Sequence, residues 1–199
     1  MKFSLPLLAV IVVYTWILDP LTPGWAAHVV TLIVLALSLA KAIRSGEWGL
    51  RPAAFLPALR DAVALTLPAL GVIYAVGSER GTLHARAHPG RDLALLMVWA
   101  AGQQFALQTV LLRETQAVTS RRVGIVLAAA LFGALHLPNP FLAPVTFLAA
   151  LGWCWIYDRH PNLLPLALSH AVSTLVILSA LDAGLTGRLR IGYAYLQLD

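Results

Sequence analysis

Long, uninterrupted apolar runs constrain this chain more than any other feature of its sequence. A helix that crosses the hydrocarbon core of a bilayer needs about 20 mostly apolar residues, because it rises about 1.5 Å per residue. Seven runs approach this length, at residues 3–18, 25–43, 62–78, 93–112, 123–137, 141–157 and 164–181. A soluble chain of 199 residues could not bury so many of them. The sequence therefore predicts an all-α, polytopic transmembrane helical bundle with about seven spans.

The composition agrees with this class and excludes a nucleic-acid-binding domain. Apolar residues make up 59% of the chain and charged residues 12%, about half the share that is usual in soluble domains. The formal net charge of +5 is better explained by basic residues that face anionic lipid headgroups. We find no repeat, low-complexity tract or linker, so residues 1–199 are expected to form a single transmembrane domain whose main partner is membrane lipid.

The loops between the predicted spans indicate an orientation, because cytoplasmic loops carry more Lys and Arg. One side receives nine of these residues, namely Lys2, Lys41, Arg44, Arg51, Arg60, Arg113, Arg121, Arg122 and Arg159. The other side receives five, namely Arg80, Arg86, Arg91, Arg188 and Arg190. We therefore expect an integral protein of a bacterial inner (cytoplasmic) membrane with its N-terminus in the cytoplasm.

Three further expectations concern the membrane surface. Residues 45–61 mix aromatic and basic side chains, which is typical of a short helix that lies in the interface. The weakly amphipathic tail after residue 182 is expected to lie along the interface as well. Arg113 and Glu114 are neighbours at the end of a span, where we expect them to form an ion pair at the membrane surface.

Polar side chains inside the apolar runs carry most of the functional information, because they are costly in lipid. They form three clusters: Gln103, Gln104 and Gln108; Phe132 and His136; and Ser169, His170, Ser173 and Thr174. Residues four apart share one face of a helix, so each cluster can present its polar groups together. Two interpretations remain open. The groups either converge in one pocket or simply hold helices together by hydrogen bonds.

These residues, at these spacings, resemble the CAAX protease and bacteriocin-processing (CPBP) family of intramembrane glutamic proteases. That family is identified by Glu-Glu-x-x-x-Arg, then Phe-x-x-x-His, then His-x-x-x-Asn. Here Gln103-Gln104-x-x-x-Gln108 takes the first position, Phe132-x-x-x-His136 matches the second, and His170-x-x-x-Thr174 matches the third except at its end. The motif-bearing region covers about residues 92–182.

The resemblance implies a helical bundle and assigns roles by position. The first Glu and the second-motif His would activate water, so Gln103 and His136 are the candidate residues for that step, with Gln104 replacing the second Glu. His170 and Thr174 would stabilise the oxyanion, and Gln108 replaces the Arg that supports the acids. Phe132 is a supporting residue. The implied substrate is a lipidated or transmembrane peptide, or another apolar ligand of isoprenoid type, and no cofactor is implied.

The glutamines depart from the family pattern in a way that bears on function. A neutral amide cannot act as a general base, which leaves His136 as the only candidate. Three functions remain open: hydrolysis of a lipidated or transmembrane peptide with His136 as base, binding of a membrane segment or isoprenoid lipid by an inactive pseudo-protease, and different chemistry on a lipid. We do not expect a metal site, because two histidines fall short of the usual three protein ligands.

Overall fold

The computed structural model describes residues 1–198, and their regular structure is helical apart from one isolated bridge between Leu50 and Asn162. The α-helices are α1 (Ser4–Val13), α2 (Ala26–Ser45), α3 (Phe55–Glu79), α4 (Pro89–Phe105), α5 (Arg113–Val118), α6 (Arg121–Ala134), α7 (Leu142–Arg159), α8 (Leu163–Ala180), α9 (Ala183–Thr186) and α10 (Gly192–Leu196). Two π-helical segments, Tyr14–Leu18 and Ala106–Leu112, extend α1 and join α4 to α5. Short 3-10 turns occupy Asp19–Leu21, Pro52–Ala54 and Gly187–Leu189.

Each of the seven predicted runs contains a helix, and five of the helical stretches are long and apolar enough to cross a membrane. The other two runs correspond to α6 and α7. Helix α6 has 14 residues and is therefore about 21 Å long, shorter than the roughly 30 Å hydrocarbon core. Helix α7 ends in the charged pair Asp158-Arg159, which lowers its hydropathy. The prediction of a transmembrane helical bundle is confirmed, and α6 and α7 are the two of the seven predicted spans that are not both long and apolar enough to count as candidate spans.

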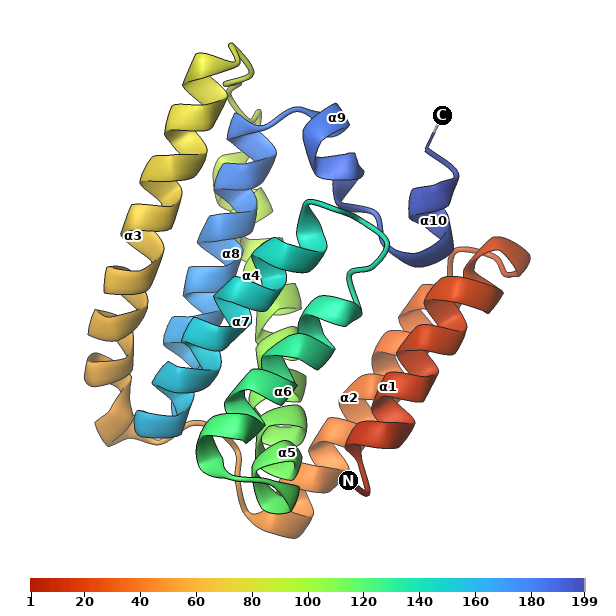
Figure 1. Ribbon diagram of the computed structural model, residues 1–199, viewed down its shortest axis with the longest axis vertical. Coiled ribbons are helices and arrows are strands. Elements are labelled where there is room, and N and C mark those ends of the chain that lie inside the picture. The colour runs from red at the N-terminus through yellow and green to blue at the C-terminus, as the bar shows by residue number, and fades with distance from the viewer. Residues whose placement is uncertain (199) are drawn as a thin grey trace.

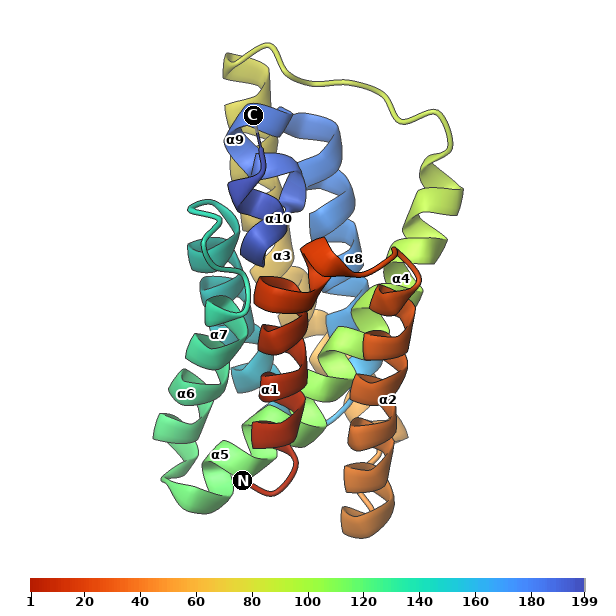
Figure 2. The same cartoon turned by 90° about the vertical axis from the view of Figure 1, so that its right-hand side faces the viewer.

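Successive long helices run in opposite directions between the two ends of the molecule (Figures 1 and 2). Figure 2 shows α4 and its continuation crossing the bundle obliquely, from the end that holds the 79–89 loop to the end that holds the N-terminus. All seven residues of the π-helical segment Ala106–Leu112 are buried, so this crossing element forms much of the core. Helix α1 packs on it through Leu7, which contacts Ala106 and Val110.

Ion pairs at the N-terminal end overturn one prediction. The Glu114 carboxylate accepts hydrogen bonds from the backbone N–H groups of Phe3 and Ser4, at 3.1 and 2.9 Å, and from the Ser4 hydroxyl at 2.8 Å. Glu114 thereby satisfies amides at the start of α1, where a negative charge is also favoured by the helix dipole. Arg113 contacts Glu47 at 2.7 Å and Asp158 at 3.6 Å. The predicted Arg113–Glu114 pair is therefore wrong, because each side chain has a partner distant in sequence.

The predicted interfacial helix over 45–61 is also wrong. Helix α3 begins at Phe55 and continues without a break to Glu79. The residues before it form a loop that is tied to the start of α8, where the Leu163 N–H donates to the Gly49 carbonyl at 2.8 Å. Gly49 has a φ of +68°, and a Cβ there would lie 2.8 Å from the Tyr157 hydroxyl. A glycine is therefore required for this close approach.

Candidate functional site

The end of α4, which holds Gln103 and Gln104, and the π-helical segment, which holds Gln108, place the three glutamines in different surroundings. Gln104 and Gln108 are completely buried, and Gln108 Nε2 donates to Gln104 Oε1 at 2.9 Å. Gln103 lies about 100° around the helix from Gln104 and faces a cavity instead. Of the two neighbouring glutamines, Gln103 therefore lines the cavity and Gln104 does not. π-helical turns occur frequently at functional sites, which agrees with the position of this one beside the cavity.

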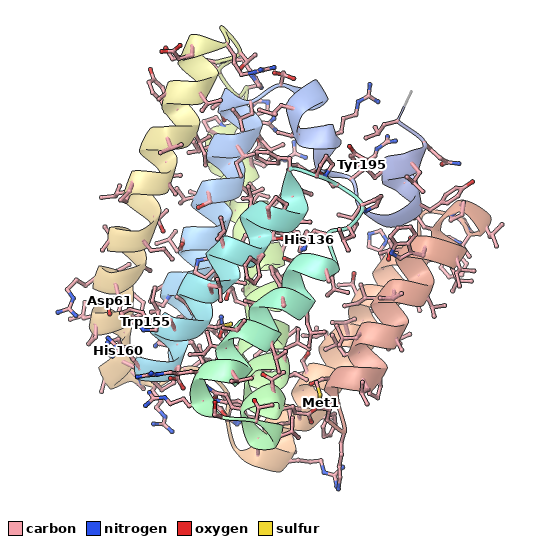
Figure 3. The ribbon with its side chains drawn as sticks, in the orientation of Figure 1. Met1, Asp61, His136, Trp155, His160 and Tyr195 are labelled. Carbon is pink, nitrogen blue, oxygen red and sulfur yellow. The ribbon has the colours of Figure 1, made fainter. Side chains whose placement is uncertain are left out.

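His136 is held by the end of α6. Its Nδ1 lies 2.7 Å from the Phe132 carbonyl oxygen. A carbonyl can only accept, so Nδ1 carries the proton and the neutral ring keeps its lone pair on Nε2. The next helix begins soon afterwards because Asn139 Oδ1 accepts from the Phe141 and Leu142 N–H groups, at 3.0 and 2.9 Å. Helix α6 ends at Ala134, before Pro138, so His136 lies just beyond its last residue (Figure 3).

His170, in the middle of α8, is surrounded by aromatic rings. Its ring centroid lies 4.6 Å from that of Trp153, 5.1 Å from that of Trp99 and 6.4 Å from that of Phe132. The Phe132 ring also lies 5.0 Å from the His136 ring, so it contacts both imidazoles. This arrangement explains why a phenylalanine four residues before His136 matters: it supports the two histidines together.

A chain of hydrogen bonds fixes the Trp153 ring against His170. Trp153 Nε1 donates to Ser169 Oγ at 2.9 Å, and Ser169 Oγ lies 2.6 Å from Thr66 Oγ1, which donates to the Ala62 carbonyl at 2.6 Å. Because the Thr66 proton goes to that carbonyl, the Ser169 hydroxyl must donate to Thr66. Sequence reasoning missed Trp153 and Thr66. The available signal was a tryptophan inside an apolar run, whose N–H needs a buried partner.

A cavity of about 740 Å³ opens beside these residues. Its wall includes Gln103, His136, His170 and Thr174 together with Trp99, Trp153, Ser169 and Ser173, and it is otherwise formed mainly by aliphatic side chains of α3, α7 and α8. Gln104 and Gln108 lie behind the wall and do not line it. None of the lining residues in the described part of the chain is an Asp, Glu, Lys or Arg.

Buried polar atoms without a partner concentrate at this site. Within residues 1–198, the buried side-chain atoms that lack a hydrogen bond are Gln103 Oε1, Gln104 Nε2, Gln108 Oε1 and His170 Nδ1. Buried polar groups are normally satisfied. Of these four residues only Gln103 and His170 line the cavity, so their unpaired atoms are the ones that a polar group of a ligand or water could reach. No cluster of three or more His, Cys, Asp or Glu side chains suited to a metal ion occurs in the part of the chain that the structure describes.

Comparison with known families identifies the core that carries this geometry. Residues 91–176 match the family model described as type II CAAX prenyl endopeptidase Rce1-like. This match supports the assignment to the CPBP family. The matched segment runs from the start of α4 to near the end of α8 and contains every motif position of this CPBP-like chain, from Gln103 to Thr174. No curated protein and no solved structure matches the chain.

Proposed function

We propose that this protein binds the apolar part of a lipidated or transmembrane peptide in its cavity and does not hydrolyse it. The observation that carries the proposal is the composition of the cavity wall, which combines one amide, two imidazoles and several hydroxyls without a carboxylate. Efficient general-base catalysis contributes about 10²–10⁴ in rate, and a neutral amide cannot supply it. The buried Gln104–Gln108 hydrogen bond stands where the family pattern has an acid and its supporting arginine.

The size of the cavity supports a ligand with an extended chain. A volume of about 740 Å³ is within the range of pockets that hold drug-sized molecules. A complete transmembrane helix is about 10 Å wide and 30 Å long, and is therefore too large. An isoprenoid or acyl chain with a short polar end fits the aliphatic wall, with the polar end beside Gln103, His136 and His170.

One observation favours slow hydrolysis as a second candidate function. The hydrogen bond from His136 Nδ1 to the Phe132 carbonyl leaves the Nε2 lone pair available on a residue that lines the cavity. An imidazole in this tautomer is able to accept a proton from water. Hydrolysis by this route would use His136 as its only base.

Binding can be tested with a fluorescent peptide that carries an S-farnesyl group and with two matched variants. Ala69 and Ala64 are both exposed on α3, but only Ala69 lines the cavity. The unmodified protein in detergent should bind the peptide saturably, and Ala69→Trp should weaken binding by about tenfold or more because the indole occupies the cavity. Ala64→Trp should leave binding unchanged. An absence of saturable binding, or an equal loss in both variants, would contradict the proposal.

We also propose that the N-terminal end faces the cytoplasm. The nine basic residues on the N-terminal side and the five on the other support this orientation. Hydrogen bonds group the loops in the same way, since Arg121 and Gln116 contact Asp158 at one end while Arg80 contacts Asp182 at the other. Reporter fusions at Ser120 and Gly81 should report cytoplasmic and external locations respectively. The same location at both positions would refute the assignment.

A further inference from the structure

Part of the C-terminal segment lines the cavity. We define the C-terminal strap as residues 186–192, which connect α9 to α10. Leu189 and Ile191 of the strap line the cavity, whereas Arg188 and Arg190 are exposed. The side chains thus alternate between cavity and exterior. Gly187–Leu189 forms a 3-10 turn, and only Arg190 (φ −79°, ψ 152°) and Ile191 (φ −133°, ψ 167°) have an extended backbone. The tail therefore forms part of the site and is not a separate interfacial element.

The strap is tied to the loop that follows His136. Asn139 Nδ2 donates to the carbonyls of Thr186 and Arg190, at 2.9 and 3.0 Å, and the Gly192 N–H donates to the Leu137 carbonyl at 2.8 Å. The last bond joins the strap to the residue directly after His136. Figure 3 shows Tyr195, which packs against Gly187, at the same end of the molecule as His136.

Two neighbouring residues of the strap adopt an unfavourable backbone conformation. Arg188 has a φ of 51° and Leu189 has a φ of 54°, and neither is a glycine. This left-handed region is costly for residues with a Cβ, and such strain persists only where the surroundings impose it. Neither Arg188 nor Arg190 forms an ion pair with a described residue. The strap is held by its three anchoring hydrogen bonds, by Leu189 and Ile191, and by the close packing of Gly187 on Tyr195 and of Gly192 on Thr15.

We propose that the strap occupies the place of a ligand's peptide backbone beside His136, so that a lipidated peptide displaces the strap when it binds while its lipid chain enters the open cavity. The proposal rests on the function proposed above and adds its regulation. Extended peptides are commonly recognised by main-chain hydrogen bonds combined with pockets for alternate side chains. The strap already makes this type of contact beside His136, with the Gly192–Leu137 bond and the inserted Leu189 and Ile191 side chains. The backbone strain favours release when another chain takes that place.

The test uses the reactivity of a cysteine placed on the strap. Cys154 is the only cysteine of the chain and is fully buried, so background labelling should be low. Ile191→Cys should react slowly with a maleimide in detergent, and the S-farnesyl peptide should accelerate the reaction by displacing the strap. Leu196→Cys, exposed on the same tail, should react quickly with or without the peptide. Protection of Ile191→Cys by bound peptide, or no change, would overturn the proposal.

A second pair of variants separates strap closure from the loss of a charge. Arg188→Gly relieves the left-handed strain, so it should slow labelling of Ile191→Cys and weaken peptide binding by about fivefold. Arg190→Gly removes the same charge at a position without strain and should accelerate labelling. If the unmodified protein and Arg188→Gly bind the peptide equally well, the strap proposal is wrong but the proposed binding function stands. If nothing binds the peptide, the proposed function fails, and the labelling rates of the two glycine variants still test closure.

Discussion

Gln108→Arg should lower the free energy of unfolding by about 3–5 kcal/mol, because it buries a guanidinium without a counter-charge. Gln108 is completely buried, and its one side-chain partner is the neutral amide of Gln104. Adding Gln104→Glu to this variant should restore most of the loss, since the new carboxylate lies where the Gln104 oxygen now accepts from Gln108. Thermal and chemical unfolding in detergent would measure both variants.

The double-mutant cycle gives this prediction its control. Gln104→Glu alone should be milder than Gln108→Arg, because a buried carboxyl group can remain protonated. The coupling between the two changes should be favourable, as expected for residues in direct contact. Gln197→Arg, at an exposed position of the tail, should have little effect. Independent, additive effects at Gln104 and Gln108 would contradict the arrangement described for the π-helical segment.

Trp153→Ala should also be strongly destabilising, by about 3–5 kcal/mol, because it removes a large buried aromatic side chain. Trp153 is 3% exposed, packs against the His170 ring and donates to Ser169. Trp153→Phe keeps an aromatic ring beside His170 and loses the N–H donor, which should cost only about 1 kcal/mol for the hydrogen bond. Unfolding in detergent measures the stability of each variant, and titration with the fluorescent S-farnesyl peptide measures its binding.

The comparison of the two Trp153 variants identifies the role of the ring. If its contact with His170 shapes the cavity, Trp153→Phe should retain peptide binding and Trp153→Ala should lose it. Equal loss of binding in both variants would show that the Ser169 hydrogen bond, and not the ring, is what matters. Equal stability of the unmodified protein, Trp153→Phe and Trp153→Ala would contradict the buried packing of Trp153 against His170.

The features that could be predicted from the sequence are those set by local spacing. Apolar runs reveal membrane helices because the bilayer fixes their length. The i, i+4 spacing also correctly places Gln104 beside Gln108. Neighbouring residues of a helix face about 100° apart, and here Gln103 lines the cavity while Gln104 lies behind its wall.

The features that the sequence did not reveal depend on contacts between distant residues. Glu114 caps α1 from more than 100 positions away, and no local pattern distinguishes this contact from an ion pair with Arg113. Thr66 on α3 reaches the site only through Ser169 on α8. The strap lies beside the cavity because Asn139 donates to the carbonyls of Thr186 and Arg190. The weak amphipathicity of the C-terminal tail, taken alone, favours a position at the membrane surface.

Peptide cleavage tests the central claim most directly, because the claim is that a CPBP-like site without carboxylates binds and does not cut. The S-farnesyl peptide would be incubated with the unmodified protein, with His136→Ala, and with the triple variant Gln103→Glu, Gln104→Glu and Gln108→Arg. We predict no cleavage by the unmodified protein above the level of His136→Ala, and a gain of cleavage in the triple variant. Cleavage by the unmodified protein that His136→Ala abolishes would contradict the account and establish His136 as the base of an active hydrolase.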